Sequence, residues 1–225
     1  MPRPTDVGRV LAAVAIVAVA TPRAISAQSL FERLNLDRLR LTALGASAGP
    51  VKASRAETAQ SFGVHADYGY IARSWRVVFS ATYWGSHFRD EYVQELEDRV
   101  RGHIIDPSGD DTVDFGQINV SDIALELDMR YTPSPGTAVR LYAGGGVGAH
   151  IVNAESPFIN DTFVESALDN ISAGFAAFAG FDTEPVGRLS FGVQGRVNLL
   201  SNLRYWSGRA LITYFFGSQP PSSPP

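Results

Sequence analysis

Cysteine is absent from this chain of 225 residues, and lysine occurs only once, at Lys52. The lack of cysteine excludes a disulfide scaffold, and 45% hydrophobic residues against 19% charged ones exclude a disordered chain. Positive charge is scarce, since after residue 27 the 16 basic residues face 22 acidic ones and the net charge is −6. That balance disfavours nucleic-acid binding. After Gln28 no apolar run reaches the roughly 18 residues that a membrane-spanning helix needs, so a helical membrane protein is excluded.

The first 27 residues have the pattern of a secretory signal peptide. Arg3 and Arg9 precede an apolar run of 11 residues, 10–20, and small residues follow it up to Ala27. A basic segment, a short apolar segment and a small-residue cleavage site are the parts of such a signal. The alternative is an N-terminal membrane anchor, for which the run is too short. We therefore expect residues 1–27 to be a signal peptide and residues 28–38 to be a periplasmic N-terminal segment.

Eight stretches of the remaining chain alternate between apolar and polar residues with a period of two. In the clearest one, Leu125, Leu127 and Met129 share one face, while Glu126 and Asp128 share the other. A helix would mix these faces, whereas a strand keeps them apart. The expected strands are 39–48, 62–72, 75–86, 122–131, 139–151, 171–182, 188–199 and 206–216. The first of these has the least regular alternation.

Strand length and connections favour a membrane barrel over a soluble one. The stretches have about ten residues, and a tilted strand crosses a bilayer with 9–11. Short connections such as Arg73-Ser74 alternate with long polar ones, His87–Asn119 and Asn153–Asp169. Short turns on one side and long loops on the other are typical of outer-membrane barrels. A soluble sandwich or a lipocalin-like barrel would also alternate, but it would have to expose many Gly and Ala positions beside its charges.

Aromatic residues are expected on the apolar face at both ends of the strands, where amphipathic rings are favoured in a membrane. The periplasmic group, with the mature N-terminus in the periplasm, is Tyr70, Trp75, Tyr131, Phe181, Tyr214 and Phe216. The outer group is Tyr83, Tyr205 and Trp206. Core aromatics of a soluble β protein would not be sorted by strand end.

Three segments carry a resemblance to a known family. They are the signal segment, the strand LYAGGGVGAHI at 141–151 and the closing strand RALITYFF at 209–216. With them the chain resembles the small eight-stranded outer-membrane β-barrel superfamily, which includes the transmembrane domain of outer-membrane protein A and the opacity-type adhesins. The resemblance implies an all-β, eight-stranded antiparallel up-and-down transmembrane β-barrel over residues 39–216, in the bacterial outer membrane. The family usually ends at the final aromatic residue, so the Pro/Ser-rich tail 217–225 is a departure, and such a tail cannot add a strand.

The polar faces of the strands are expected to line the lumen. The predicted polar network is Asp67, Arg76, Glu126, Asp128, Arg130, Arg140, Arg196 and Arg209. Further candidates on these faces are Arg40, Arg188, Asp182, His65 and His150, and inward glycines are expected to make room for long arginine side chains. Eight strands enclose an interior that side chains just fill, and buried charges must be paired or hydrated. We therefore expect a plugged lumen, with a narrow gated pore as the alternative.

The segment 87–119 is the most acidic part of the chain, with nine acidic residues against three arginines. Within it, residues 90–102 combine early acids, helically spaced apolar residues, late arginines and a following glycine, which predicts a short helix in an extracellular loop. Asp106, Asp110, Asp111 and Asp114 could share a calcium ion, but their spacing is not that of an EF-hand loop. Plain surface repulsion is the favoured role of this negative charge, and contact with lipopolysaccharide bridged by a divalent cation is the alternative. No metal site is predicted.

The sequence predicts no catalytic residue and no cofactor. Ser86, His87 and His150 do not have the spacing of lipid A deacylases or outer-membrane phospholipases, and a base must lie within reach of its nucleophile. We expect a non-enzymatic outer-membrane protein with a structural or surface-interaction role. A small-solute channel is the first alternative and a lipid A-modifying enzyme the second. Expected partners are outer-membrane lipids, lipopolysaccharide and, during insertion, the barrel-assembly machinery. Nucleic acid is not expected to bind, and the protein is expected to be a monomer.

Overall fold

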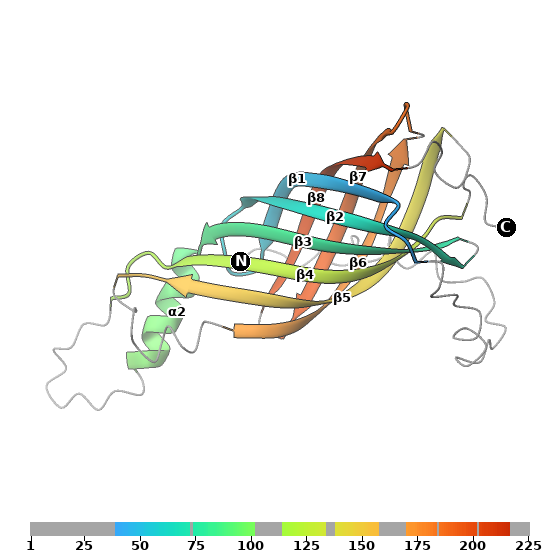
Figure 1. Cartoon of the computed structure of the whole chain (residues 1–225). Helices are drawn as coiled ribbons and strands as arrows, with labels where there is room; N and C mark the ends of the chain where they lie inside the picture. The colour runs from blue at the N-terminus through green and yellow to red at the C-terminus, as the bar shows by residue number, and fades with distance from the viewer. Residues whose placement is uncertain are drawn as a thin grey trace, which may run out of the picture. The chain divides into compact units, whose positions relative to one another are not determined.

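Eight antiparallel strands close into a barrel in which each strand pairs with the next and β8 pairs with β1 (Figure 1). The computed structural model describes residues 39–72, 74–101, 114–133, 138–157, 170–183, 185–201 and 203–216. The strands are β1 (Ala43–Ala53), β2 (Ala59–Ala72), β3 (Trp75–His87), β4 (Asn119–Tyr131), β5 (Val139–Glu155), β6 (Asn170–Thr183), β7 (Leu189–Leu200) and β8 (Arg204–Phe215). The eight-stranded up-and-down barrel expected from the sequence is confirmed. The predicted signal peptide 1–27, the periplasmic segment 28–38 and the tail 217–225 lie outside the described residues.

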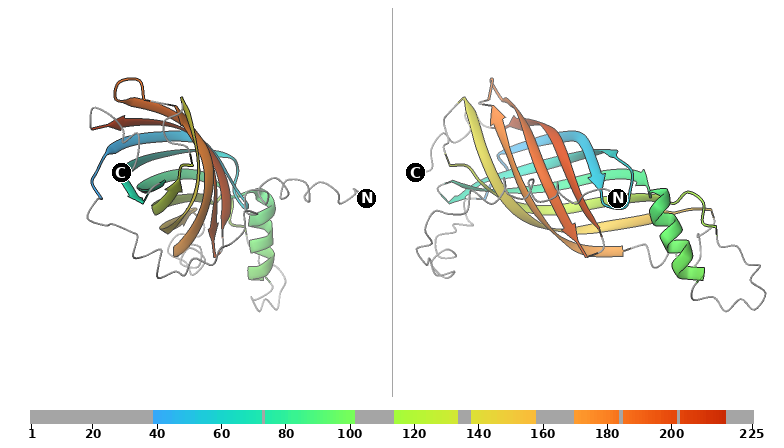
Figure 2. Two further views of the ribbon diagram at one scale, coloured as in Figure 1. Left: turned by 90° about the vertical axis from the view of Figure 1, so that its right-hand side faces the viewer. Right: turned by 180° about the vertical axis from the view of Figure 1, so that it is seen from behind.

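Connection lengths distinguish the two ends of the barrel. The connections β2–β3, β4–β5 and β6–β7 are short and lie at one end, here named the turn end. The other end, here named the loop end, has the long connections 88–118 and 156–169 and the helix α2 (Asp90–Arg101). Figures 1 and 2 show α2 beyond the strand ends on this side. The asymmetry predicted from the sequence is therefore present in the structure.

The helix α2 forms where the acidic segment predicts it. Asp90 and Glu91 lie in its first turn and Arg99 and Arg101 in its last, which complements the helix dipole. Arg99 also pairs with Glu95, four residues earlier, at 2.7 Å. Its buried face carries Val93, which packs against the barrel. Within the described part of the chain, no helix has the length and apolar character to cross a membrane.

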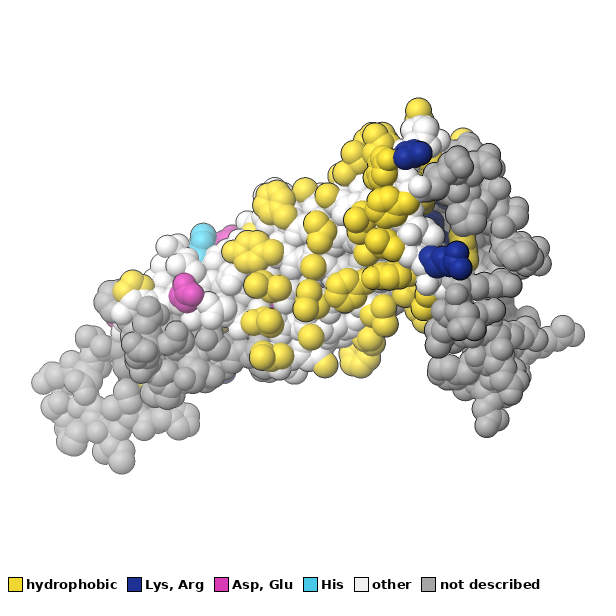
Figure 3. Space-filling model, in the orientation of Figure 1, with side chains coloured by type: hydrophobic (Ala, Val, Ile, Leu, Met, Phe, Trp, Pro, Cys, Tyr) yellow, Lys and Arg dark blue, Asp and Glu magenta, His cyan; other side chains and the backbone are white. Residues whose placement is uncertain are grey.

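Large apolar side chains cover the outside of the barrel. Phe62, Leu127, Leu141 and Phe175 are 50–66% exposed, whereas the charged residues between such positions are buried. On β4, buried and exposed residues alternate along the whole strand. Figure 3 shows the hydrophobic side chains gathered on the wall between the two ends. Exposed apolar surface on this scale is unfavourable in water and marks a membrane contact.

The first strand differs from its prediction, because it begins at Ala43 and not at Leu39, and it runs on to Ala53. Most residues of β1 are small, so that its two faces differ little in hydropathy and the alternation does not mark the ends. Pro50 lies inside this strand. A proline has no N–H to donate, and the pairing with β8 is interrupted between Ala48 and Val51.

Two of the nine predicted girdle aromatics do not lie on the outside. Tyr205 is only 3% exposed and faces the lumen. Tyr70 pairs directly with the inward Arg76, whose guanidinium lies 5.1 Å from the centre of its ring. The cause is a bulge at Gly69, which has a positive φ of 80° and donates its N–H to Asp67 Oδ1 at 2.8 Å. The other seven rings are 37–53% exposed.

Candidate functional site

The barrel lumen contains all eight side chains of the predicted polar network. Their fractional exposures lie between 1% and 7%. They come from six strands, β2, β3, β4, β5, β7 and β8, so that the barrel closure brings together residues up to 142 positions apart. Charges this deeply buried are costly unless they are paired, and their partners therefore decide what the lumen can do.

Arg196 is the centre of the half of the lumen that is nearer the loop end. Its Nη2 lies 2.6 Å from Glu126 Oε1 and its Nη1 lies 2.8 Å from Asp128 Oδ2. Its Nε donates to Asn198 Oδ1 at 2.9 Å. Since a guanidinium carries five N–H donors in a fixed fork, one arginine can bind two carboxylates and an amide at the same time. β4 and β7 are thereby connected across the interior.

A second chain of hydrogen bonds continues from this centre towards the loop end. Asn198 Nδ2 donates to Glu126 Oε1 at 3.1 Å and lies 2.7 Å from Tyr205 Oη, which donates to Asp122 Oδ2 at 2.9 Å. His150 Nδ1 lies 3.0 Å from the same Asp122 oxygen. Asp122 and Asn198 are not in the predicted network, although each shares the polar face of its strand with a predicted member. Tyr205 was expected on the outside, and nothing in the sequence marks it as a luminal residue.

The half of the lumen at the turn end contains three arginines. Arg76 and Arg130 are directly opposite each other on β3 and β4, an arrangement that would be repulsive without carboxylates. Asp67 Oδ2 lies 2.6 Å from Arg76 Nη2, and Asp182 Oδ2 lies 3.1 Å from Arg130 Nη1, so that each arginine has its own carboxylate. The third, Arg140, donates to the carbonyl oxygen of Thr183 at 3.2 Å.

The balance of luminal charge differs from the one predicted. Arg40 and Arg188 are exposed and do not face the lumen. In the described part of the chain, five arginines and five acidic side chains face inwards. The arginines are Arg76, Arg130, Arg140, Arg196 and Arg209, and the acids are Asp67, Asp122, Glu126, Asp128 and Asp182. The interior is therefore neutral, whereas the residues that the sequence assigns to the lumen comprise seven arginines and four acids.

The inward glycines make room for acidic side chains and for the rings of other residues, and not for the arginine side chains that the sequence led us to expect. A Cβ on Gly146 would collide with the carboxylate of Asp128, its direct neighbour on β4. A Cβ on Gly148 would likewise meet Glu126, and one on Gly174 the ring of His150. Each of these large polar side chains lies flat over a glycine of an adjacent strand. The glycines of β5 and β6 thus provide the space in which the network is packed.

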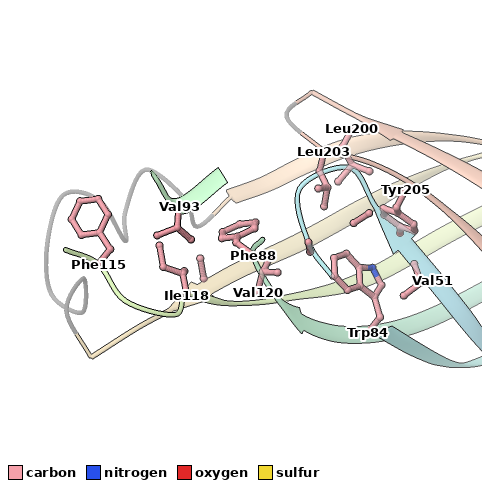
Figure 4. Close-up of a cluster of buried hydrophobic side chains, with 13 residues drawn as sticks. Val51, Trp84, Phe88, Val93, Phe115, Ile118, Val120, Leu200, Leu203 and Tyr205 are labelled. Carbon is pink, nitrogen blue, oxygen red and sulfur yellow. The ribbon is translucent and has the colours of Figure 1, made fainter. Parts of the chain in front are cut away.

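An apolar cluster closes the lumen at the loop end. We name it the apolar cap, and its buried members include Val51, Trp84, Phe88, Val93, Ile118, Val120, Leu200, Leu203 and Tyr205. Figure 4 shows these side chains pointing towards one another from the strand ends and from α2. Trp84 and Tyr205 meet edge to face at 5.5 Å, and Phe88 meets Tyr92 of α2 at 4.9 Å. The hydroxyl of Tyr205 belongs to the polar network, so the cap and the network are continuous.

Among the described residues, neither His65 nor His150 is paired with a serine hydroxyl. His150 is bound to Asp122, and His65 Nε2 lies 3.0 Å from the hydroxyl of Thr213. Ser86 donates its hydroxyl hydrogen to the carbonyl oxygen of Glu57. Of the four aspartates considered as sharing a calcium ion, only Asp114 is described, and it accepts a hydrogen bond from the N–H of Gly116. The described residues contain no cluster of His, Asp or Glu that could hold a metal ion.

Closed topology, strand lengths and an apolar outer wall define this chain as a small eight-stranded β-barrel of the bacterial outer membrane. No family model and no curated protein matches the sequence. Among solved structures, it is similar to neisserial surface protein A, with 14% identity, a TM-score of 0.51 and coverage of 77% of this chain and 96% of that one.

The outer membrane protein OprG from Pseudomonas aeruginosa gives 14% identity and a TM-score of 0.50, with coverage of 81% of this chain and 99% of that one. The outer membrane enzyme PagL matches at 8% identity and a TM-score of 0.34, over 76% of this chain and 98% of its own. At these identities the similarity extends to the fold alone.

Proposed function

We propose that this protein is a non-conducting outer-membrane barrel with a structural or surface-interaction role, and that its loop end faces the outside of the cell. The observation that carries the proposal is that two successive layers of side chains block the lumen. The charged network around Arg196 fills the middle of an interior in which arginines and acids balance, and the apolar cap covers it at the loop end. An ion crossing the barrel would have to break paired charges and then pass an apolar layer.

Bilayer recordings test the absence of conduction. The unaltered protein should show no steady conductance above background in planar bilayers. Arg196→Ala should produce small, irregular leaks, because it removes the side chain that joins β7 to Glu126 and Asp128. Arg188→Ala, at an exposed arginine of the β6–β7 turn, is the matched control and should stay silent. A large and regular conductance from the unaltered protein would favour the small-solute channel instead.

The orientation follows from loop length, since outer-membrane barrels have short periplasmic turns and longer extracellular loops. It can be tested with trypsin on intact cells. Cleavage should occur after Arg99 or Arg101, whose side chains are more than half exposed on α2. Arg188, in a turn at the opposite end, should be protected until the outer membrane is permeabilised. If trypsin spares α2 on intact cells but cuts it after permeabilisation, the loop end does not face outwards.

An enzymatic role is not favoured by the described side chains. The most enclosed acid–histidine pair, Asp122 and His150, is 0–1% exposed and lies among other luminal groups, where a lipid substrate has no access. We therefore retain the non-enzymatic proposal. Its partners would be outer-membrane lipids and lipopolysaccharide around the wall, and the barrel-assembly machinery during insertion. The protein would act as a monomer, because the apolar wall needs no second copy when lipid surrounds it.

A further inference from the structure

The outer wall changes from apolar to polar across one row of paired residues. Phe62 of β2 pairs with Tyr83 of β3, which pairs with Ile123 of β4. On the turn-end side of this row, the next outward residues are Val64, Ala81 and Leu125. On the loop-end side, the outward positions form two cross-strand rows of mainly polar residues, Gly85–Ser121–Asn153 and His87–Asn119–Glu155. The Phe62 row therefore marks the level at which the hydrocarbon ends.

A groove of about 800 Å³ lies in the wall on the apolar side of this row. Its floor is formed by small residues of neighbouring strands, and its sides by larger ones. The small residues include Ala48, Ala81 and Ala210, and the larger ones include Phe62, Tyr83 and Phe191. The volume lies in the range of ligand-sized cavities, about 300–1,000 Å³. This apolar groove faces the membrane interior, so its occupant is an acyl chain.

A second groove of about 560 Å³ lies on the polar side of the row and shares Phe62 and Tyr83 with the first. Its polar lining is Gln60, Ser86, Asn119, Ser121, Asn153 and Glu155. Asn153 donates to Glu155 Oε1 at 2.6 Å, which fixes the carboxylate in the groove. The hydroxyl of Tyr83 lies over Gly85, where a Cβ would be only 2.9 Å from it. One tyrosine thus has its ring in the apolar groove and its hydroxyl at the polar groove.

We propose that the two grooves form one binding site for a glycolipid of the outer leaflet, with an acyl chain in the apolar groove and the sugar in the polar groove. The proposal rests on the orientation given above, with the loop end outside. Three amides, two serine hydroxyls and one carboxylate suit the hydroxyl and amide groups of a sugar. None of the residues that line the polar groove is basic. A phospholipid phosphate, which binds best to Arg or Lys, therefore has no cationic partner there.

The polar groove must provide the selectivity. An acyl chain gains no hydrophobic free energy by moving from other lipid tails to the wall, because both environments are apolar. The apolar groove contributes only van der Waals contact with a chain of matching shape. Hydrogen bonds at the membrane surface then decide which lipid stays, so a glycolipid should be retained and a phospholipid should exchange.

Competition between two lipids tests this site. The protein is folded in lauryldimethylamine oxide micelles and incubated with equal amounts of a phosphate-free glycolipid, monogalactosyldiacylglycerol, and dioleoylphosphatidylglycerol, and native mass spectrometry counts the lipids that remain after gel filtration. The glycolipid should be retained about tenfold more than the phospholipid, which is the effect of one or two hydrogen bonds. Glu155→Ala combined with Asn153→Ala, outside the hydrocarbon region, should abolish this preference.

The apolar groove is tested with Ala48→Phe and, in case that variant fails to fold, Ala210→Phe, since both residues line it. Either change should fill the groove and reduce glycolipid retention to the phospholipid level. Ala177→Phe is the matched control, because Ala177 is an outward, exposed residue of β6 outside the groove. Equal retention of both lipids by the unaltered protein, or unchanged retention in both groove variants, would overturn the proposal. Neither result alters the expectation for conductance, so the two proposals fail separately.

Discussion

Replacing Arg196 by methionine should destabilise the barrel by about 3–5 kcal/mol, the cost of removing one partner from a buried ion pair. Arg196 is 3% exposed and binds both Glu126 and Asp128 at less than 3 Å. Without it, two buried carboxylates lose their nearest cation, and the lumen keeps four arginines against five acids. The free energy of unfolding can be measured by urea titration of protein folded in lipid vesicles, followed by tryptophan fluorescence.

Two further variants separate charge from packing in this experiment. Adding Glu126→Gln to Arg196→Met should recover much of the stability, because the lumen then again has balanced charge, with four arginines and four acids. Arg188→Met, at an exposed position, should stay within about 0.5 kcal/mol of the unaltered protein. If Arg196→Met lowers the free energy of unfolding no more than Arg188→Met does, the luminal network does not stabilise the barrel.

Leu127→Arg should impair insertion by about 2–4 kcal/mol, the cost of an arginine on the lipid face at the midplane of a barrel. Leu127 is 50% exposed on the outside of β4. It lies four residues from Ile123, in the row where the wall turns polar, and four residues from Tyr131, whose ring contacts Trp75 at the turn end. That position is the centre of the apolar wall.

Leu141→Arg is a control of the same chemistry at a different depth. Leu141 is 63% exposed but lies near the start of β5 at the turn end. An arginine there can reach the interface, so the cost should fall to about 0–1 kcal/mol. Heat-modifiable migration in gels and the yield in outer membranes measure insertion in both variants. Normal migration and yield for Leu127→Arg would contradict the assignment of this face to lipid.

The architecture was predictable from the sequence because the period-two alternation directly reports which face of a strand is buried. On β4 every residue from Asp122 to Arg130 has the burial that the alternation predicts. β1 shows where this signal ends, since small residues on both faces give no contrast and the strand was placed four residues too early. At Tyr70 the alternation itself was misleading, because a bulge shifts the register by a step that no residue pattern marks.

The partners inside the lumen could be predicted only in part. Charge identifies the arginines and acids, but pairing depends on strand register and on the distance across the barrel, as in the contact between Arg196 and Asp128, 68 residues apart. Asn198 shares the polar face of its strand with Arg196 but has no charge that would identify a partner, and nothing in the sequence marks Tyr205 as luminal. The apolar cap was missed for a related reason: Trp84 and Leu203 look like ordinary strand and loop residues until closure of the barrel places them at one mouth.

The apolar wall has a consequence for how such a chain can diverge. Lipid tails are fluid and adapt to an apolar surface of any shape. Outside the apolar groove, positions such as Leu127 therefore need a hydrophobic side chain but not one of a particular shape. The inner face is constrained much more tightly, because a methyl group on Gly146 would already displace Asp128. About half of each strand is thus free to drift among apolar residues while strand number and register persist. Barrels of this kind can therefore keep one topology even when their sequences no longer resemble one another.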